Sequence, residues 1–223
     1  MKISQILKIQ PGVTALIGGG GKTTLMYRLA KELSAVGTVI VGTSTKIVEP
    51  EDLTILTGSS KEEITAALQS RRVICIGTKA DGGKLSAPLV SFGELAKFAD
   101  YIIVEADGAH RLPIKAHAGY EPVIPEGTNK TILVIGADAF GKPIAEICHR
   151  PELFAKAASV DIQSVITPEI AARVIAHEGL GDYVYINKVE TDKTMKISKQ
   201  FAEKSSLPVA AGSLKTEEYL WLC

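Results

Sequence analysis

The chain of 223 residues has few cysteines and no excess of charge, and both features exclude classes of protein. Cys75, Cys148 and Cys223 lie far apart in no paired spacing, which argues against a disulfide framework or a cysteine zinc site and predicts a reducing, cytoplasmic location. Lysine plus arginine equals aspartate plus glutamate, 25 each. Because nonspecific nucleic-acid binding needs a broad positive field, we expect no nucleic-acid partner.

Long apolar runs are also missing. No stretch approaches the ~20 apolar residues of a membrane-spanning helix. We also expect no signal peptide at the N-terminus, because Lys8 and Pro11 interrupt its apolar residues. Apolar residues make up 46% and charged residues 22% of the chain, the balance of a folded globular protein. We therefore predict one domain over residues 1–223, with no membrane partner.

Short β-branched runs alternate with helical patterns along the chain. Most of the runs are apolar throughout, which predicts strands buried on both faces of a parallel sheet: Val13–Ile17, Thr38–Gly42, Arg72–Gly77, Tyr101–Glu105, Thr131–Gly136, Tyr183–Asn187 and Pro208–Ala211. Helices are expected between them, in Leu25–Leu33, Glu62–Ser70, Phe92–Phe98, Pro168–His177 and Lys193–Lys204. Thr167 is expected to cap the fourth of these helices, with Pro168 in its first turn. This alternation predicts a three-layer α/β fold with a mostly parallel central sheet flanked by helices.

A glycine loop between the first predicted strand and the first predicted helix carries the strongest functional signal. Glycines let backbone N–H groups approach phosphate oxygens closely, and the helix that follows adds its N-terminal partial charge. We expect nucleotide contacts from the whole loop: Gly18, Gly19, Gly20, Gly21, Lys22, Thr23 and Thr24. Lys22 would reach the β- and γ-phosphates, and the Thr23 hydroxyl would hold Mg²⁺. The pattern predicts a P-loop NTPase-like domain that binds a nucleoside triphosphate with Mg²⁺; the alternative is a glycine-rich turn without a ligand.

The loop departs from the standard pattern G-x-x-x-x-G-K-[ST], whose first glycine would fall on Leu16. Gly18, Gly21, Lys22 and Thr23 instead match the compact loop G-T-x-G-K-[ST]. In this respect the loop resembles that of the Mur ligase family. The signal is therefore stronger for nucleotide binding than for hydrolysis.

Two carboxylates end the fourth predicted strand. Strand C-termini of a parallel sheet open onto the ligand crevice, so Glu105 or Asp107 is expected to hold the Mg²⁺ through water. Glu105 to Gly108 also has the spacing of the D-x-x-G switch of GTPases, with glutamate in place of aspartate. The alternative is that both carboxylates only cap a turn.

The stretch after this strand, Asp107–Asn129, is long and rich in polar and basic residues, which is typical of functional loops. Arg111 and Lys115 are expected to neutralise phosphate charge in a transition state or to hold an anionic second substrate. His110 and His117 are candidate general bases or metal ligands. A buried cysteine beside a polar turn accounts for Cys148–Arg150 better than a metal site does. Thr43–Lys46 follows the second predicted strand and is a candidate nucleotide or metal contact, the alternative being an ordinary strand-to-helix turn. Asp138 closes another strand and is a candidate ribose or substrate contact.

A late motif favours recognition of a nucleotide base. Asn187, Lys188 and Glu190 follow the sixth predicted strand, and Gly212–Lys215 follows the seventh. The pair resembles the two guanine-reading elements of GTPases, N-K-x-D and the S-A-K loop. Glu190 is one methylene longer than the aspartate, so GTP is favoured but ATP and CTP stay open.

Four segments together resemble the YqeC-type accessory proteins of selenium-dependent molybdenum hydroxylases. These are the glycine loop, the E-A-D-G strand end, the L-P-I-K-A-H-A-x-x-E-P-V-I-P segment and the late N-K motif. The resemblance implies a P-loop fold and a role in maturing a selenium-containing molybdenum enzyme, with that client enzyme or its cofactor as a partner. Nothing in the composition or spacing speaks of selenium or molybdenum.

Three functions fit these signals. The first is a nucleoside-triphosphate hydrolase whose turnover gates delivery of a cofactor or ligand to a client. The second is a transferase or ligase that phosphorylates or nucleotidylates a small anionic molecule. The third is a nucleotide sensor or scaffold without catalysis.

Overall fold

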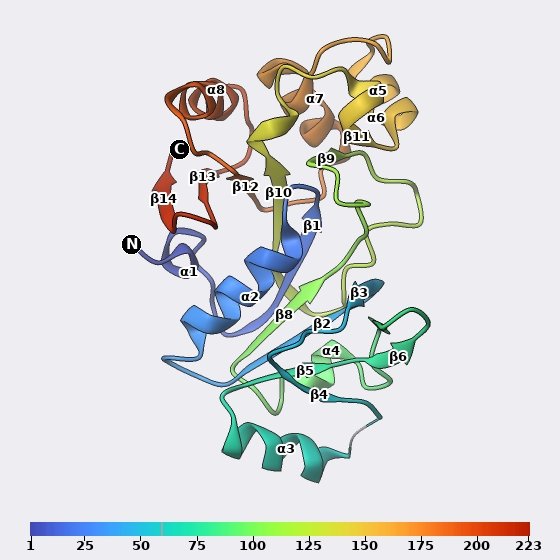
Figure 1. Ribbon diagram of the computed structural model, residues 1–223, viewed down its shortest axis with the longest axis vertical. Coiled ribbons are helices and arrows are strands. Elements are labelled where there is room, and N and C mark those ends of the chain that lie inside the picture. The colour runs from blue at the N-terminus through green and yellow to red at the C-terminus, as the bar shows by residue number, and fades with distance from the viewer. Residues whose placement is uncertain (59) are drawn as a thin grey trace.

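The computed structural model describes residues 1–58 and 60–223 and is built around a nine-stranded sheet (Figure 1). The strand order is β14–β13–β12–β10–β1–β8–β2–β5–β4, and every neighbouring pair is parallel except β13 with β14. The strands span β1 Gly12–Gly18, β2 Val39–Thr43, β4 Thr54–Leu56, β5 Val73–Ile76, β8 Tyr101–Glu105, β10 Thr128–Gly136, β12 Tyr183–Asn187, β13 Val209–Ser213 and β14 Glu218–Trp221. The mostly parallel sheet expected from the sequence is confirmed.

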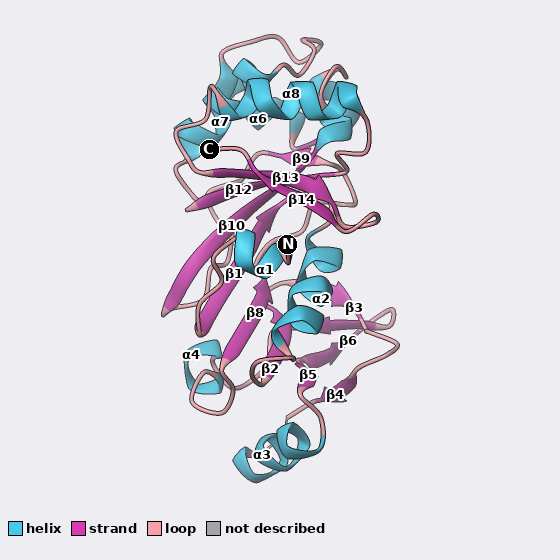
Figure 2. Cartoon of the chain, turned by 90° about the vertical axis from the view of Figure 1, so that its left-hand side faces the viewer, coloured by secondary structure: helices cyan, strands magenta, loops and turns pink. Residues whose placement is uncertain are grey.

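Helices cover both faces of this sheet (Figures 1 and 2). They span α1 Ile3–Ile6, α2 Lys22–Leu33, α3 Lys61–Ser70, α4 Phe92–Leu95, α5 Ile144–Ile147, α6 Pro151–Ala158, α7 Pro168–Glu178 and α8 Asp192–Ala202, with a 3-10 turn at Ala137–Ala139. Along β2, Val39 and Val41 pack with α1 and α2, whereas Ile40 between them packs with α3 and α4. Because successive side chains enter different cores, the sheet is buried on both faces, as the apolar runs predicted.

Element boundaries follow local chemistry. All seven expected strands are present, although β10 begins at Thr128 rather than at Thr131. The helix expected over Phe92–Phe98 already ends at Leu95. The Thr167 side chain accepts a hydrogen bond from the Ile170 N–H and starts α7 at Pro168, as its capping pattern predicted.

Two small sheets lie beside the main one. The first joins β3 Lys46–Val48, β7 Lys84–Ser86 and β6 Thr78–Ala80 in antiparallel order, and the second pairs β9 Ile114–Lys115 with β11 Cys148–His149. Strands this short show too little alternation to be recognised in a sequence. They place segments from distant parts of the chain beside the carboxyl edge of the main sheet.

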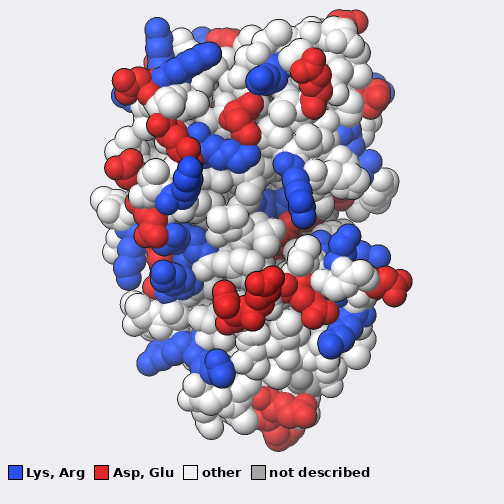
Figure 3. Space-filling view, in the orientation of Figure 1, with Lys and Arg blue, Asp and Glu red and all other residues white. Residues whose placement is uncertain are grey.

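Among the described residues, no helix combines the length and apolar character required to cross a bilayer. The face drawn in Figure 3 carries basic and acidic side chains side by side, in keeping with the balanced charge of the sequence.

Candidate functional site

The glycine loop joins β1 to α2 at the carboxyl edge of the sheet, where ligands of parallel α/β folds bind. Gly21 takes the N-cap position of α2 with φ 113°, in the left-handed region that favours glycine. A Cβ at Gly19 would lie 2.6 Å from the Leu112 carbonyl oxygen, so only glycine fits there. The loop borders a cavity of about 820 Å³, lined by Gly19–Thr24, Thr45–Val48, Lys84, Glu105, Gly108–Leu112 and Lys188.

Lys22 and Thr23 begin α2 and meet Glu105 at the end of β8. The Thr23 hydroxyl donates a hydrogen bond to Glu105 Oε2 at 2.6 Å, and Lys22 Nζ lies 3.7 Å from Glu105 Oε1. Burial raises the pKa of Glu105, and the Lys22 ammonium and the Thr23 hydroxyl oppose that rise. Of the two predicted metal carboxylates, Glu105 is therefore the one that lies beside the Thr23 hydroxyl.

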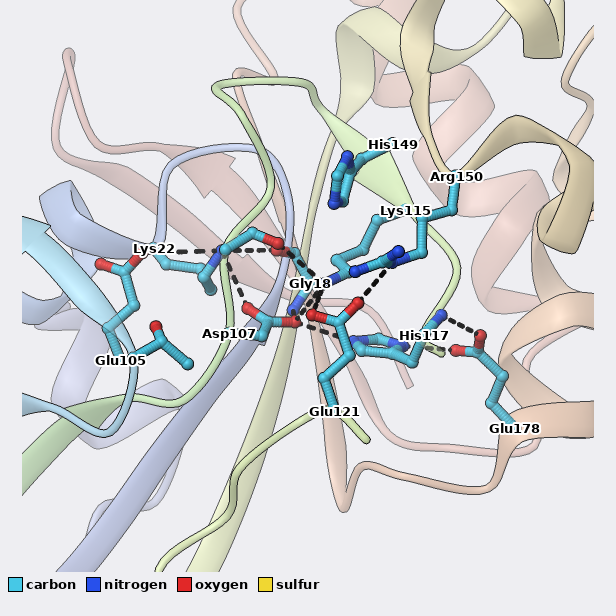
Figure 4. Close-up of polar contacts among 12 residues, drawn as sticks. Gly18, Lys22, Glu105, Asp107, Lys115, His117, Glu121, His149, Arg150 and Glu178 are labelled. Atoms are coloured by element: carbon cyan, nitrogen blue, oxygen red, sulfur yellow. Dashed lines mark hydrogen bonds and ion pairs between the residues drawn. The ribbon is translucent and has the colours of Figure 1, made fainter. Parts of the chain in front are cut away.

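Asp107 occupies a different position, behind the glycine loop (Figure 4). Its side chain is fully buried, and Oδ2 accepts a hydrogen bond from the Gly18 N–H at 2.8 Å. Oδ1 forms an ion pair with Lys22 Nζ at 3.0 Å, and Lys22 Nζ also donates to the Gly18 carbonyl at 2.5 Å. Asp107 therefore holds both ends of the short loop and does not line the cavity.

A buried histidine extends this contact to α7. His117 Nε2 lies 2.8 Å from Asp107 Oδ2, and His117 Nδ1 lies 2.7 Å from Glu178 Oε2 (Figure 4). Burial lowers the pKa of His117, but the two carboxylates outweigh it and leave the pKa above its usual value. Burial likewise opposes ionisation of Asp107, yet the hydrogen bond from His117 and the charges of Lys22 and Lys115 bring its pKa to about 2. When His117 is protonated, the two groups form an ion pair.

Lys115 lies in the same buried cluster instead of facing the cavity. Its Nζ lies 3.3 Å from Asp107 Oδ2 and 3.0 Å from Glu121 Oε2, and it donates to the Gly108 carbonyl at 2.7 Å. Arg150 Nε donates to Glu121 Oε1 at 2.5 Å. The structure thus places Lys115 where it supports Gly108 and Asp107, without direct access to a bound phosphate.

The other candidates of this loop face the cavity. His110 and Arg111 both adopt left-handed backbone conformations, with φ 49° and 64°, and both line the cavity. His110 stacks on His149 with ring centroids 4.6 Å apart. Arg111 is the cavity-facing one of the two basic residues predicted in this stretch. Thr43 is buried, and its Oγ1 donates to the Glu105 carbonyl at 2.8 Å and ties the end of β2 to β8.

The late motif contacts the glycine loop through its asparagine. Asn187 Nδ2 donates to the Gly20 carbonyl at 2.7 Å, and its Oδ1 accepts from the Leu214 N–H at 3.2 Å. Asn187 therefore connects β12, the segment after β13 and the glycine loop, and both of its amide groups are occupied.

The remaining two residues of the motif lie nearer the surface. Lys188 lines the cavity and forms an ion pair with Asp138 at 2.7 Å. Glu190 is exposed, and its Oε1 accepts from the Ser213 hydroxyl at 2.9 Å. The structure therefore brings the two predicted base-reading elements together.

No group of three or more histidine, cysteine or acidic side chains with metal-binding geometry occurs in residues 1–58 and 60–223. Cys148 is buried, as predicted for a cysteine beside a polar turn, and burial raises the pKa of its thiol to about 12. His110 and His117 do not converge on a shared ligand set in the described chain.

Several residues of the site carry no sequence signal of their own. Glu178 is the last residue of a helix that begins far from the glycine loop in sequence, and Lys84 lies on a strand of three residues. Lys46, by contrast, belongs to the predicted Thr43–Lys46 segment and lines the cavity. Glu121 fell within the long functional loop but was not singled out. Only the fold brings these residues to the site.

Comparisons with known proteins identify relatives. The family model described as YqeC protein matches residues 14–152. A curated relative, the uncharacterized protein YqeC of Escherichia coli (strain K12), is 32% identical over 158 residues, covering 66% of this chain and 60% of that protein. The signal recognition particle 54 kDa protein of Aeropyrum pernix K1, solved in complex with GDP, aligns at 14% identity with a TM-score of 0.42. That alignment covers 96% of this chain and 44% of the other, and the likeness is too weak to support an inference.

Proposed function

The chain belongs to the YqeC protein family, and from this premise we propose that it binds a nucleoside triphosphate with Mg²⁺ through Gly18–Thr24. One observation carries the proposal. A strand–glycine loop–helix unit opens onto a large cavity, and its Lys22 and Thr23 meet a strand-end carboxylate there. Phosphate binding at loops of this kind needs these same three groups, a lysine, a hydroxyl and a carboxylate.

The oxygen groups at this point fit Mg²⁺. Mg²⁺ prefers oxygen ligands and keeps several waters, and the Thr23 hydroxyl with the Glu105 carboxylate supplies two oxygens at one place. Thr23 would hold the ion directly and Glu105 through water. When bound, Mg²⁺ would offset charge on the terminal phosphates. Lys22, now paired with Asp107, would turn its ammonium to the same phosphates.

We expect Glu105→Gln and Asp107→Asn to separate the roles of the two carboxylates. Glu105→Gln should reduce the Mg²⁺ dependence of triphosphate binding by about tenfold, because a neutral amide orients metal-bound water poorly. Asp107→Asn should weaken binding with and without Mg²⁺ alike, because Asp107 holds the loop rather than the metal. Titrating the triphosphate at several Mg²⁺ concentrations measures both effects, and a reversed pattern would assign the metal to Asp107.

Glu190→Ala tests whether the late motif reads guanine. A carboxylate that accepts hydrogen bonds from guanine N1 and N2 should stabilise binding by about 1.5–3 kcal/mol, the contribution of a charged hydrogen bond. Adenine offers that carboxylate no such donors. We therefore expect the Kd for GTP to rise about tenfold and the Kd for ATP to stay unchanged. Equal losses, or none, in binding titrations of both nucleotides would retire guanine selectivity. Asp192→Ala, on the next helix and exposed, is the matched control.

For the reaction we propose slow hydrolysis of the bound triphosphate, stimulated by a client protein. Switch-type NTPases are poor catalysts alone and accelerate when a partner completes the site. The family resemblance implies that this client is a selenium-dependent molybdenum hydroxylase or its cofactor. The test is phosphate release with and without the client, beside client affinity in the triphosphate and diphosphate states. No release together with unchanged affinity would leave a nucleotide sensor or scaffold.

A second candidate is transfer of a phosphoryl or nucleotidyl group to a small anionic molecule. The basic side chains that line the cavity beyond the glycine loop favour it. Product analysis with labelled triphosphate separates the two: label in free phosphate supports hydrolysis, and label in a small molecule supports transfer.

A further inference from the structure

We propose that the cavity holds a second, small oxyanionic ligand beside the terminal phosphate, in a basic lobe formed by Lys46, Lys84 and Arg111. The proposal rests on nucleotide binding at the glycine loop and names a second ligand class for the same cavity. All three side chains line that cavity, together with the glycine loop, Thr45 and Glu105. Lysine and arginine side chains gather over this side of the molecule, around the small sheet, with acidic side chains beside them (Figure 3).

The pleat of the small sheet places the two lysines on one face. Ile47 of β3 and Leu85 of β7 form a cross-strand pair, and both are buried in the core. Because side chains alternate along a strand, Lys46 and Lys84 point away from that core. They are diagonal neighbours across the antiparallel pair, roughly 7–8 Å apart by backbone position. Two long side chains at that spacing reach a single anion.

Arg111 comes from a different segment of the cavity lining, the turn after β8. The turn that carries it packs directly on the glycine loop, because the Gly20 N–H donates to the Leu112 carbonyl at 3.1 Å. His110 and Arg111 form that turn with two successive left-handed residues, a conformation that costs free energy and is enriched at functional sites. The turn thus places Arg111 in the lining of the cavity that Lys46 and Lys84 also line.

The direction of a bound nucleotide places this lobe beyond its last phosphate. In the sheet, β12 and β13 lie on one side of β1, and β8 and β2 lie on the other. The base-reading residues follow β12 and β13, so the base lies toward them, and the terminal phosphate lies toward Glu105 of β8. Lys46 follows β2 by only a few residues and therefore lies farther out in the same direction.

The charged side chains that line the cavity favour the binding of a second anion. Among residues 1–58 and 60–223, five cationic side chains line the cavity, Lys22, Lys46, Lys84, Arg111 and Lys188, against the single carboxylate of Glu105. Lys22 and Lys188 have carboxylate partners. Lys46, Lys84 and Arg111 form no ion pair in residues 1–58 and 60–223. Mg²⁺, Lys22 and the start of α2 already offset the charge of a triphosphate. The positive charges of the lobe therefore remain available to bind a second anion.

The test titrates inorganic phosphate or sulfate into protein saturated with Mg²⁺ and a non-hydrolysable triphosphate analogue, at constant ionic strength. The analogue fills the terminal phosphate position, so a further oxyanion must bind elsewhere. We expect one oxyanion per chain by calorimetry, weakened about tenfold or more in Lys46→Ala/Lys84→Ala and in Arg111→Ala. Affinity for the analogue should change less than about threefold. Lys79→Ala/Lys97→Ala removes the same charge from exposed positions outside the cavity and should bind as the parent does.

Three other results overturn the proposal. The first is no oxyanion uptake by the analogue complex, and the second is equal uptake by the parent and Lys46→Ala/Lys84→Ala. The third is a loss of affinity for the triphosphate analogue in the variants that is as large as their loss of affinity for the oxyanion. That result would assign the basic lobe to the nucleotide's own phosphates. Failure of the parent to bind the analogue is a distinct outcome, because it removes the phosphate-loop site itself and the second ligand with it.

Discussion

Lys22→Ala should abolish most of the affinity for nucleoside triphosphates. Truncating one partner of a buried, hydrogen-bonded charge pair costs about 2–5 kcal/mol, which corresponds to roughly 30-fold to several thousand-fold in Kd. Thermal shift with GTP, ATP and CTP, each with and without Mg²⁺, measures the loss. A ligand at a hundred times its Kd stabilises the folded state by about 2.7 kcal/mol, or roughly 5–10 °C in a domain of this size.

The surroundings of Lys22 in the structure determine how the result for Lys22→Ala is interpreted. Lys22 is only 5% exposed and pairs with Asp107, so the variant also removes one of several cations around that carboxylate. Because Lys115 and His117 remain beside Asp107, the fold should survive, and the melting temperature without ligand shows whether it does. Lys31→Ala, exposed near the end of the same helix, is the matched control. A Lys22→Ala protein that binds as well as the parent would refute the phosphate-loop assignment.

The sequence predicted those parts of the fold that depend on neighbouring residues. Apolar runs such as Tyr101–Glu105 and the cap at Thr167 carry their own local signal, and both appear where expected. The glycine loop is likewise a local pattern, and its strand, loop and helix follow in the predicted order. Glu105 and Asp107 were recognised as a pair, because both stand at the end of one strand.

What the sequence left open is the direction of individual side chains. Glu105 and Asp107 are two residues apart, yet one meets Thr23 and the other the Gly18 N–H, a difference that only the packed loop decides. Lys115 was expected at a phosphate but lies among buried carboxylates, because β9 pairs with β11 from a later part of the chain. Partners distant in sequence, such as Glu178, leave no periodic signal to find.

Asp107→Asn should destabilise the folded protein by about 3 kcal/mol, the low end for breaking a buried ion pair. The amide keeps a carbonyl oxygen for the Gly18 N–H but removes the negative charge that faces Lys22, Lys115 and His117. Lys115 and His117 keep Glu121 and Glu178, which is why we expect the low end of the range. Urea unfolding of the parent and the variant measures the difference.

The pH dependence of this difference identifies the charge network as its cause. Because the folded pKa of Asp107 is lowered to about 2, its contribution is complete above the unfolded pKa near 3.9 and is lost as the pH falls through about 2. Because the folded pKa of His117 is raised, its contribution is complete below the unfolded pKa near 6.5 and is lost as the pH rises through the folded value. The two proteins should therefore differ most between about pH 4 and 6.5. The control is Asp138→Asn, which breaks the exposed ion pair with Lys188. It should lower the free energy of unfolding by less than about 1 kcal/mol at any pH. A difference in the free energy of unfolding between the parent and Asp107→Asn that does not vary with pH would contradict this. It would mean that Asp107 acts only through its hydrogen bond to the glycine loop.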